Sequence, residues 1–271
     1  ALFIGEQGRC AVHISHIKCT GKQNHGRAEE VLKVLQDARA RGVQVSADQY
    51  AYDASSTGLD VLTHAVESFT AIPFLSRPRP DRPSARPAYQ GSNPISDVWS
   101  LQALRMVAKY LARAVADPSD TEARASMLLA SAYAGMGFGN AGVHLPHGMS
   151  YPVSGMVRDF RLAGYPDDRP LIPHGISVVL NAPAVFRFTA PACPERHLMA
   201  AEALGVDVSQ VRPEDAGKVL ADRITMFMNM LNLPNGLRAV GYTVSDIPKL
   251  VEGTLPQHRV TKLSPRPAEP D

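Results

Sequence analysis

Hydrophobic positions recur along the chain at two different periods, and the change of period divides it into two parts. In residues 10–17 and 43–50 apolar and polar residues alternate, which predicts two short strands. Between them, residues 27–41 carry apolar side chains at helical spacing, and Gly42 is a typical residue just beyond a helix end. Residues 8–52 are therefore predicted to form one strand–helix–strand unit with a crossover connection.

From Asp60 onward the apolar spacing is helical, and no convincing set of alternating strands follows. Asn93-Pro94 is a strong helix start, because Asn caps free N–H groups and Pro suits the first turn. Residues 71–93, rich in proline and arginine, predict a long loop. The predicted helices are 60–70, 94–116, 121–134, 148–161, 174–188, 194–204, 213–231 and 245–252. The expected fold is mainly α, a helical domain preceded by the short strand–helix–strand unit.

Composition narrows the function classes. The 271 residues are 45% hydrophobic and carry a formal net charge of +2 with both signs mixed along the chain. Such a pattern predicts no nucleic-acid partner, because binding a nucleic acid needs a clustered basic face. The sequence also has no apolar run of 18 residues, so no membrane span is expected. Three cysteines predict a reducing, cytoplasmic location rather than a disulfide framework. The first residue is Ala rather than Met, which suggests a fragment or a processed product.

Glycines gather at Gly135, Gly137, Gly139 and Gly142. A phosphate-binding loop needs a preceding strand and a following Lys-Ser or Lys-Thr, and this stretch has neither. Close packing between helices is the interpretation we favour.

One carboxylate and several histidines offer a metal site. Asp60 and His64 are four residues apart on a predicted helix, which places both side chains on one face. His144 and His147 follow in the glycine-rich stretch, and His174 stands in Pro-His-Gly. Oxygen and nitrogen ligands of this kind suit Fe(II), Zn(II) or Mn(II). Each histidine alone is equally compatible with a hydrogen-bonded position in the core.

Five stretches of the sequence carry a resemblance to a known family: residues 55–68, 86–97, 137–152, 173–175 and 253–263. Together they resemble the iron-containing (group III) alcohol dehydrogenase family, most closely its hydroxyacid-oxoacid transhydrogenase branch, over residues 55–265. The resemblance implies an all-helical domain that holds a divalent metal, Fe or Zn.

The resemblance also implies the ligands, which are Asp60, His64, His147 and His174. His144 replaces His147 if the register there is shifted. Tyr151 stands where much of the family has a proton-relaying histidine, so it is the candidate catalytic residue. With an ordinary pKa near 10, tyrosine is a poor base without help.

The family binds NAD(P) through an N-terminal Rossmann-like domain with a Gly-Gly-Gly-Ser loop, and this sequence has no such segment. The helix that usually follows residues 260–263 is also not found. NAD binding is therefore not expected, because hydride transfer needs the nicotinamide held beside the metal-bound carbon.

The first 50 residues resemble a different family, the D-aminoacylase branch of the amidohydrolases, through residues 12–18, 38–42 and 47–57. His16 matches a metal-ligand position at the end of a barrel strand, although a structural role is more common for a lone histidine. Both resemblances meet at residues 54–57, which suggests a gene fusion. The predicted parts are 1–56, an amidohydrolase-like fragment, 57–265, the metal domain, and 266–271, a disordered tail.

Three functions stay open. The first is a metal-dependent oxidoreductase acting on a hydroxy acid or alcohol, with Phe138, Asn140 and Tyr151 lining the cleft. The second is a hydrolase of esters or amides that uses a metal-bound water. A serine route is disfavoured because residues 148–152 are not Gly-x-Ser-x-Gly, although Ser150 is close to His147. The third is an inactive helical domain whose exposed apolar surface favours a homodimer.

Overall fold

The computed structural model describes residues 12–14, 28–43, 45–47, 54–162 and 170–269. The chain divides into two compact units, Ala1–Tyr52 and Asp53–Asp271. The predicted limits at residues 56 and 265 stay predictions, although residue 56 falls inside a helix rather than between two elements. Each unit is described separately below.

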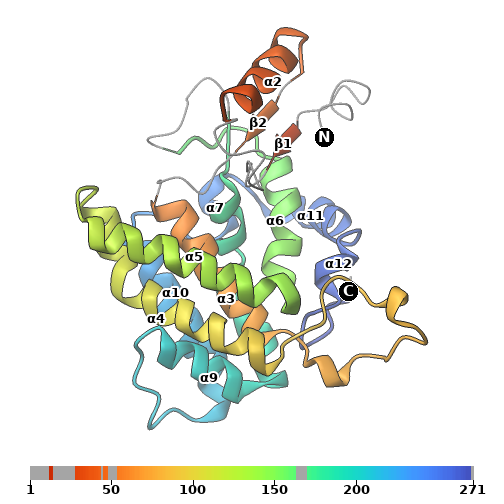
Figure 1. Ribbon diagram of the computed structural model, residues 1–271, viewed down its shortest axis with the longest axis vertical. Coiled ribbons are helices and arrows are strands. Elements are labelled where there is room, and N and C mark those ends of the chain that lie inside the picture. Colours follow the sequence, from red (N-terminus) through yellow and green to blue (C-terminus); the bar gives the residue numbers. More distant parts are fainter. Residues whose placement is uncertain (1–11, 15–27, 44, 48–53, 163–169, 270–271) are drawn as a thin grey trace. The chain divides into compact units, whose positions relative to one another are not determined.

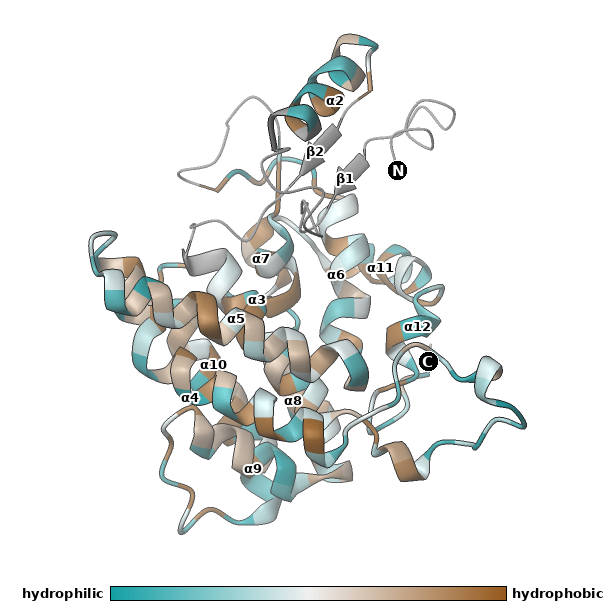
Figure 2. Ribbon diagram, viewed as in Figure 1, coloured by the Kyte–Doolittle hydropathy of each residue, from teal (hydrophilic) through white to brown (hydrophobic). Residues whose placement is uncertain are grey.

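The N-terminal unit contains two short strands and a helix: β1 (Val12–Ile14), α2 (Ala28–Ala40) and β2 (Val45–Ala47). The strands pair in parallel with Val12 opposite Val45, as the predicted crossover requires. Both lie inside the predicted ranges 10–17 and 43–50, whose remaining residues, except Val43, lie outside the described residues. Helix α2 carries both hydrophilic and hydrophobic residues (Figure 2). His16 lies outside the described residues, and the fusion hypothesis stays a prediction.

The C-terminal unit is built from helices, which confirms the predicted mainly α fold. Figure 1 shows their arrangement. Their bounds are α3 Ala54–Thr70, α4 Pro94–Ala116, α5 Thr121–Ala141, α6 Leu145–Gly155, α7 His174–Val179, α8 Ala182–Thr189, α9 Pro194–Ala203, α10 Ala216–Met230, α11 Ile247–Thr254 and α12 His258–Thr261. Short 3-10 turns occupy Phe74–Ser76, Pro83–Ala85, Ala190–Ala192, Pro213–Asp215, Leu237–Val240 and Val244–Asp246.

Helix α3 lies at the centre of this unit. It contacts α4, α5, α7 and α9, and its residues from Gly58 to Thr70 are buried all round (Figure 1). A helix buried on every side is a core helix, and the polar side chains that α3 carries need partners inside the core. Gly58 permits the close approach of α4, since a Cβ there would meet Leu111 Cδ1 at 2.2 Å. The helix begins at Ala54, six residues earlier than the apolar pattern predicted.

Several predicted boundaries are wrong for identifiable reasons. Helix α5 continues to Ala141 instead of stopping at residue 134, because Gly137 inside it allows close packing on Ser100, and it ends only at Gly142, with φ +88°. The predicted helix 174–188 is two helices, with Pro183 in the first turn of the second. Helix α6 begins at Leu145, ahead of the predicted residue 148.

Helix α4 has the predicted bounds. The Asn93 side chain accepts a hydrogen bond from the Ser96 N–H at 3.1 Å, and Pro94 occupies the first turn. Residues 71–93 form the expected loop apart from two 3-10 turns. The loop is tied to the C-terminal end by the hydrogen bond from Ile72 N–H to the Leu263 carbonyl.

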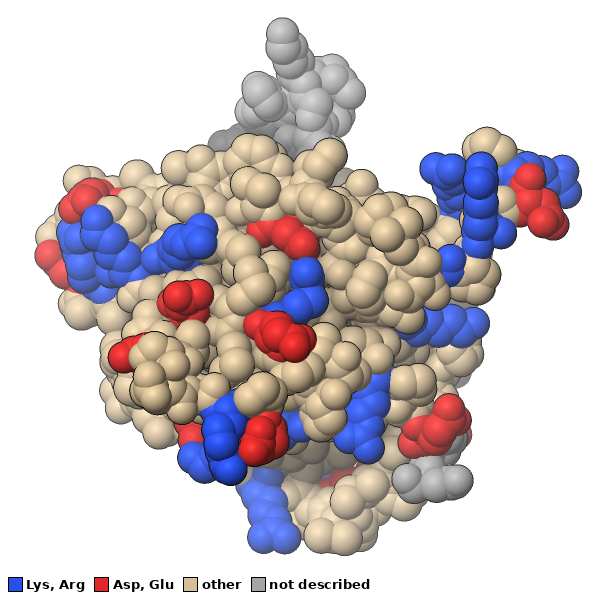
Figure 3. Space-filling model, turned by 90° about the horizontal axis from the view of Figure 1, so that it is seen from below, with Lys and Arg blue, Asp and Glu red and all other residues tan. Residues whose placement is uncertain are grey.

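Basic and acidic side chains are interspersed on the face seen in Figure 3. Among the described residues, exposed ion pairs join Arg187 to Asp222 and Arg212 to Asp215. The predicted absence of a nucleic-acid partner stays a prediction. Among the described residues, no helix combines the length and apolar character needed to cross a membrane. At the C-terminal end, Arg266 donates to the Phe188 carbonyl, and the disordered tail stays a prediction.

The glycines of α5 differ in their surroundings, which gives a matched pair of substitutions. A Cβ at Gly137 would lie 2.3 Å from Ser100 Oγ, whereas Gly135 has nothing within 4 Å. Gly137→Ala should therefore lower the free energy of unfolding by about 1–3 kcal/mol through overpacking. Gly135→Ala should raise it by about 1 kcal/mol, because alanine favours helix. Urea unfolding of both variants checks this, and equal effects would contradict the packing argument.

Candidate metal centre

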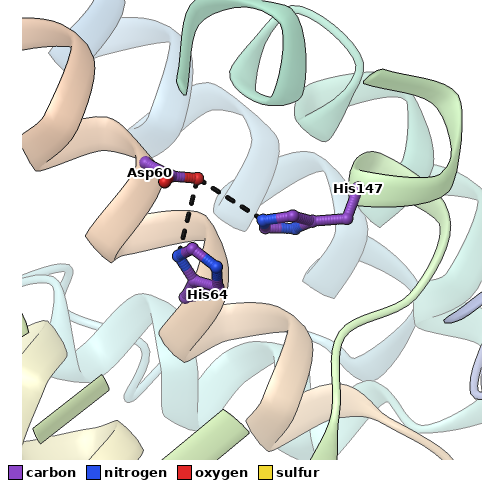
Figure 4. A group of neighbouring side chains, drawn as sticks. All are labelled: Asp60, His64 and His147. Carbon is purple, nitrogen blue, oxygen red and sulfur yellow. Dashed lines mark ion pairs between the residues drawn. The ribbon is translucent and has the colours of Figure 1, made fainter. Parts of the chain in front are cut away.

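Helix α3 supplies the first two side chains of the site. Asp60 and His64 lie one turn apart, and His64 Nδ1 is 3.5 Å from Asp60 Oδ1 (Figure 4). Both residues are buried, with 1% and 5% of their surface exposed. The four-residue spacing thus brings a carboxylate and an imidazole together inside the core, as the sequence predicted.

Helix α6 supplies His147, which faces the same carboxylate. Its Nε2 lies 3.4 Å from Asp60 Oδ1, and the two rings of His64 and His147 are 4.3 Å apart between centroids. The potential ligand atoms of Asp60, His64 and His147 all lie within 4.8 Å of one another. Figure 4 shows the Asp60 carboxylate pointing between the two imidazoles.

His174, at the start of α7, lies at the edge of this group. Its Nε2 is 3.9 Å from Asp60 Oδ1, and its ring is 5.4 Å from that of His147. It falls outside the set whose ligand atoms are all within 4.8 Å of one another. The structure therefore brings three of the four predicted ligands into one cluster and places the fourth beside it.

Glu67 is the residue that sequence reasoning missed. It is fully buried, and its Oε1 accepts hydrogen bonds from the backbone N–H groups of His144 and His147, at 3.0 and 3.1 Å. Its Oε2 contacts His147 Nδ1. One carboxylate from α3 thus caps the first turn of α6 and holds the ring of a predicted ligand. The available signal was its spacing, seven residues after Asp60 on the same helix face.

The charges of the site are coupled. Burial by itself would lower the pKa of His147, but the carboxylates of Glu67 and Asp60 raise it to about 10. Burial by itself would raise the pKa of Glu67, yet its contacts with His147 hold it below the usual value. Glu67 is therefore a carboxylate at neutral pH, able to accept the hydrogen bonds described above.

These residues fit a divalent cation. His147 Nε2 is buried, faces Asp60 and has no hydrogen-bond partner among the described residues, while Nδ1 is held by Glu67. A ligating histidine commonly donates its other ring N–H to a carboxylate in this way, and one oxygen with imidazole nitrogens suits Fe(II) or Zn(II). A buried imidazole nitrogen without a hydrogen-bond partner is destabilising, and a cation bound at His147 Nε2 would offset that cost.

Aromatic side chains surround the cluster. Phe138 of α5 stacks on His64, with ring centroids 4.2 Å apart. Tyr151 lies one turn after His147 on α6, and its ring is 6.4 Å from that of His174. Burial raises the pKa of Tyr151 above its ordinary value. Asn140 is exposed at the end of α5, where its carbonyl accepts a hydrogen bond from Gln90.

Ser150 does not form a serine–histidine pair with His147. Its hydroxyl donates to the His147 backbone carbonyl at 2.7 Å, which is an ordinary bond within a helix. The predicted preference against a serine hydrolase agrees with this geometry.

His144 belongs to a different cluster, so it does not replace His147. Its Nε2 lies 3.1 Å from Thr70 Oγ1, and its ring meets Phe186 edge to face. Phe186 in turn contacts His197, whose Nε2 is 2.9 Å from Thr189 Oγ1. Burial lowers the pKa of both His144 and His197 to about 4, so both are neutral core residues at pH 7.

Removing the Glu67 contact should weaken metal binding. Glu67→Gln keeps the size of the side chain but loses the charge that orients His147, so we expect the dissociation constant for Zn(II) or Co(II) to rise about 10- to 100-fold. Titration of the metal-free protein, followed through the Co(II) absorption spectrum, measures this. Asn93→Ala is the control: losing this cap should lower stability by about 1 kcal/mol and leave metal affinity unchanged. Equal metal affinities in all three proteins would contradict the role of Glu67.

The buried neutral histidines predict a loss of stability in acid. Unfolded histidine takes up a proton below its ordinary pKa of about 6.5, whereas folded His144 and His197 do so only near pH 4. The free energy of unfolding should therefore be highest above pH 6.5. It should decrease as pH falls towards 4, by up to roughly 3 kcal/mol per histidine. Urea unfolding at pH 7.5, 6 and 5 should show a smaller decrease in His197→Gln than in the wild type. An unchanged pH dependence would contradict this assignment.

Residues 88–271 match the family model described as Fe-containing alcohol dehydrogenase family, C-terminal. Among curated proteins, the chain is 62% identical over 213 residues to hydroxyacid-oxoacid transhydrogenase, mitochondrial, of Xenopus tropicalis, covering 78% of this chain and 46% of that protein. The Homo sapiens protein of the same name is 60% identical over 214 residues, with 79% and 46% covered. The chain spans about half the length of the curated relatives it matches.

Solved structures show the same fold. The structure of 1,3-propanediol oxidoreductase superposes with a TM-score of 0.66 at 27% identity, over 84% of this chain and 53% of that chain. Sulfoacetaldehyde reductase from Bifidobacterium kashiwanohense, solved in complex with NAD+, gives 0.60 at 25% identity, over 84% and 51%.

Proposed function

Because the chain belongs to the Fe-containing alcohol dehydrogenase family, we propose that it provides the metal-binding helical part of an oxidoreductase acting on alcohols or hydroxy acids. The observation that carries this proposal is the buried group of Asp60, His64 and His147, with Glu67 holding His147. We propose Fe(II) as its metal, with Zn(II) as the alternative, and His174 as the fourth ligand.

A divalent cation bound here would supply Lewis acidity, which polarises the oxygen of an alcohol or carbonyl substrate. The remaining roles fall to the chain itself. Glu67 fixes the orientation of His147, and Phe138 covers one face of His64, which limits the access of water on that side. Tyr151 keeps its proton at neutral pH, because burial raises its pKa.

Carbonyl reduction adds a hydride to carbon and a proton to oxygen. We propose Tyr151 as the group that gives this proton, since it lies one turn beyond His147 and beside His174. The hydride needs a nicotinamide placed against the substrate carbon. The related sulfoacetaldehyde reductase was solved with NAD+; that this chain by itself does not bind NAD stays a prediction.

The curated relatives are named for hydroxy acids and oxo acids, which supports a small carboxylate-bearing substrate. Their names also place them in mitochondria, and the predicted cytoplasmic location and homodimer of this chain stay predictions. The hydrolase alternative and the inactive domain stay predictions as well.

Metal analysis tests the proposal directly. The purified chain, reconstituted with Fe(II) or Zn(II) and then desalted, should retain about one ion per chain by mass spectrometry. His64→Ala should lose that ion, because His64 is one of the three clustered ligands. His144→Ala removes a buried histidine of the neighbouring cluster and should retain it. A wild type that retains no ion, or a His64→Ala variant that retains a full ion, would overturn the assignment.

A further inference from the structure

A cationic side chain, Arg259, lies on a helix that packs against α6. Helix α12 packs closely on α6 at Gly148, where a Cβ would lie 2.7 Å from Thr261 Cγ2. Arg259 belongs to α12, and Tyr151 lies three residues after Gly148, on the same side of α6. The close contact at this glycine therefore brings the end of the chain against the helix that carries His147.

Two tyrosines hold the Arg259 guanidinium. Its positive charge acts on Tyr151, whose pKa it lowers against the larger opposing effect of burial, and it lies over the ring of Tyr89, 5.3 Å from the ring centroid. Tyr89 is itself fixed, because it packs against Gly142, where a Cβ would lie 2.7 Å from Tyr89 Cβ. A guanidinium that stacks by its face leaves donors at its edge available.

The charge of Arg259 is not matched by a carboxylate among the described residues. Arginines elsewhere on the surface, including Arg113, Arg158 and Arg187, form ion pairs with acidic side chains, and Arg259 forms none there. Its side chain is exposed, so a solute can approach it. A positioned and unneutralised guanidinium is a suitable partner for a carboxylate, which it can bind through two parallel hydrogen bonds.

Tyr151 connects this charge to the metal centre, since its ring lies 6.4 Å from that of His174. We propose that Arg259 binds the carboxylate of the substrate while the hydroxyl or carbonyl oxygen occupies the metal centre, so that Arg259 selects hydroxy acids over neutral alcohols. Tyr151 and Tyr89 position the guanidinium. This inference rests on the proposed function, because the second anchor of the substrate is the metal.

The test compares two ligands that differ only in charge, 4-hydroxybutyrate and 4-hydroxybutanamide. Binding to the Co(II)-loaded chain is followed by calorimetry and by the Co(II) spectrum. The wild type should bind the carboxylate about 10- to 100-fold more tightly than the amide, as expected for charge-assisted hydrogen bonds. Arg259→Ala should abolish that preference with little change in amide binding, and Arg259→Lys should keep part of it.

Arg266→Ala is the matched control, because Arg266 also lies over an aromatic ring, that of Phe188, at 4.3 Å. It should keep the wild-type preference. A wild type that binds both ligands equally, or an Arg259→Ala variant that still prefers the carboxylate, would overturn the inference; the second result would mean that the carboxylate binds the metal itself. Failure of the proposed function is separately visible, since the chain would then not retain Co(II) and its spectrum would be missing.

Discussion

The carboxylate of Glu67 makes the contacts on which the candidate metal centre depends. It is buried without a solvent shell, and it joins α3 to the first turn of α6 by accepting two backbone N–H groups and contacting an imidazole. Helices usually find such caps in their own sequence, but His144, which precedes α6, offers no side-chain cap. The position of His147 and the start of its helix are therefore set by the same side chain, and the imidazole cannot shift without loss of the cap.

Local signals in the sequence predicted local structure well. The pair Asn93-Pro94 places the start of α4 correctly, because a cap and a proline act on the next turn alone. Asp60 and His64 were recognisable as neighbours for the same reason. His147 and His174, far apart in sequence, were candidates by residue type, and the family resemblance alone chose them as ligands; geometry brings His147 to Asp60, whereas His174 lies at the edge.

The features that the sequence did not predict depend on contacts between residues far apart in the chain. Glycine has low helix propensity, so the cluster after residue 134 predicted the end of a helix, yet α5 continues because Gly137 lets it approach Ser100 closely. Local patterns gave no role to Glu67, because its partner His144 lies 77 residues further along the chain. The choice between His144 and His147 likewise depended on which side of α6 faces α3.

The start of α3 at Ala54 has a consequence for how this domain can be joined to other sequences. Less than two helical turns separate that start from Asp60, and Gly58 within them is packed against Leu111. A different leading segment could be spliced before Ala54 without changing the register of the helix. One residue inserted between Gly58 and Asp60 would rotate these residues relative to each other about the helix axis by about 100°. Gly58 could then not pack on α4 while Asp60 faces His147. The sequence before Ala54 can therefore vary, whereas the number of residues between Gly58 and Asp60 cannot.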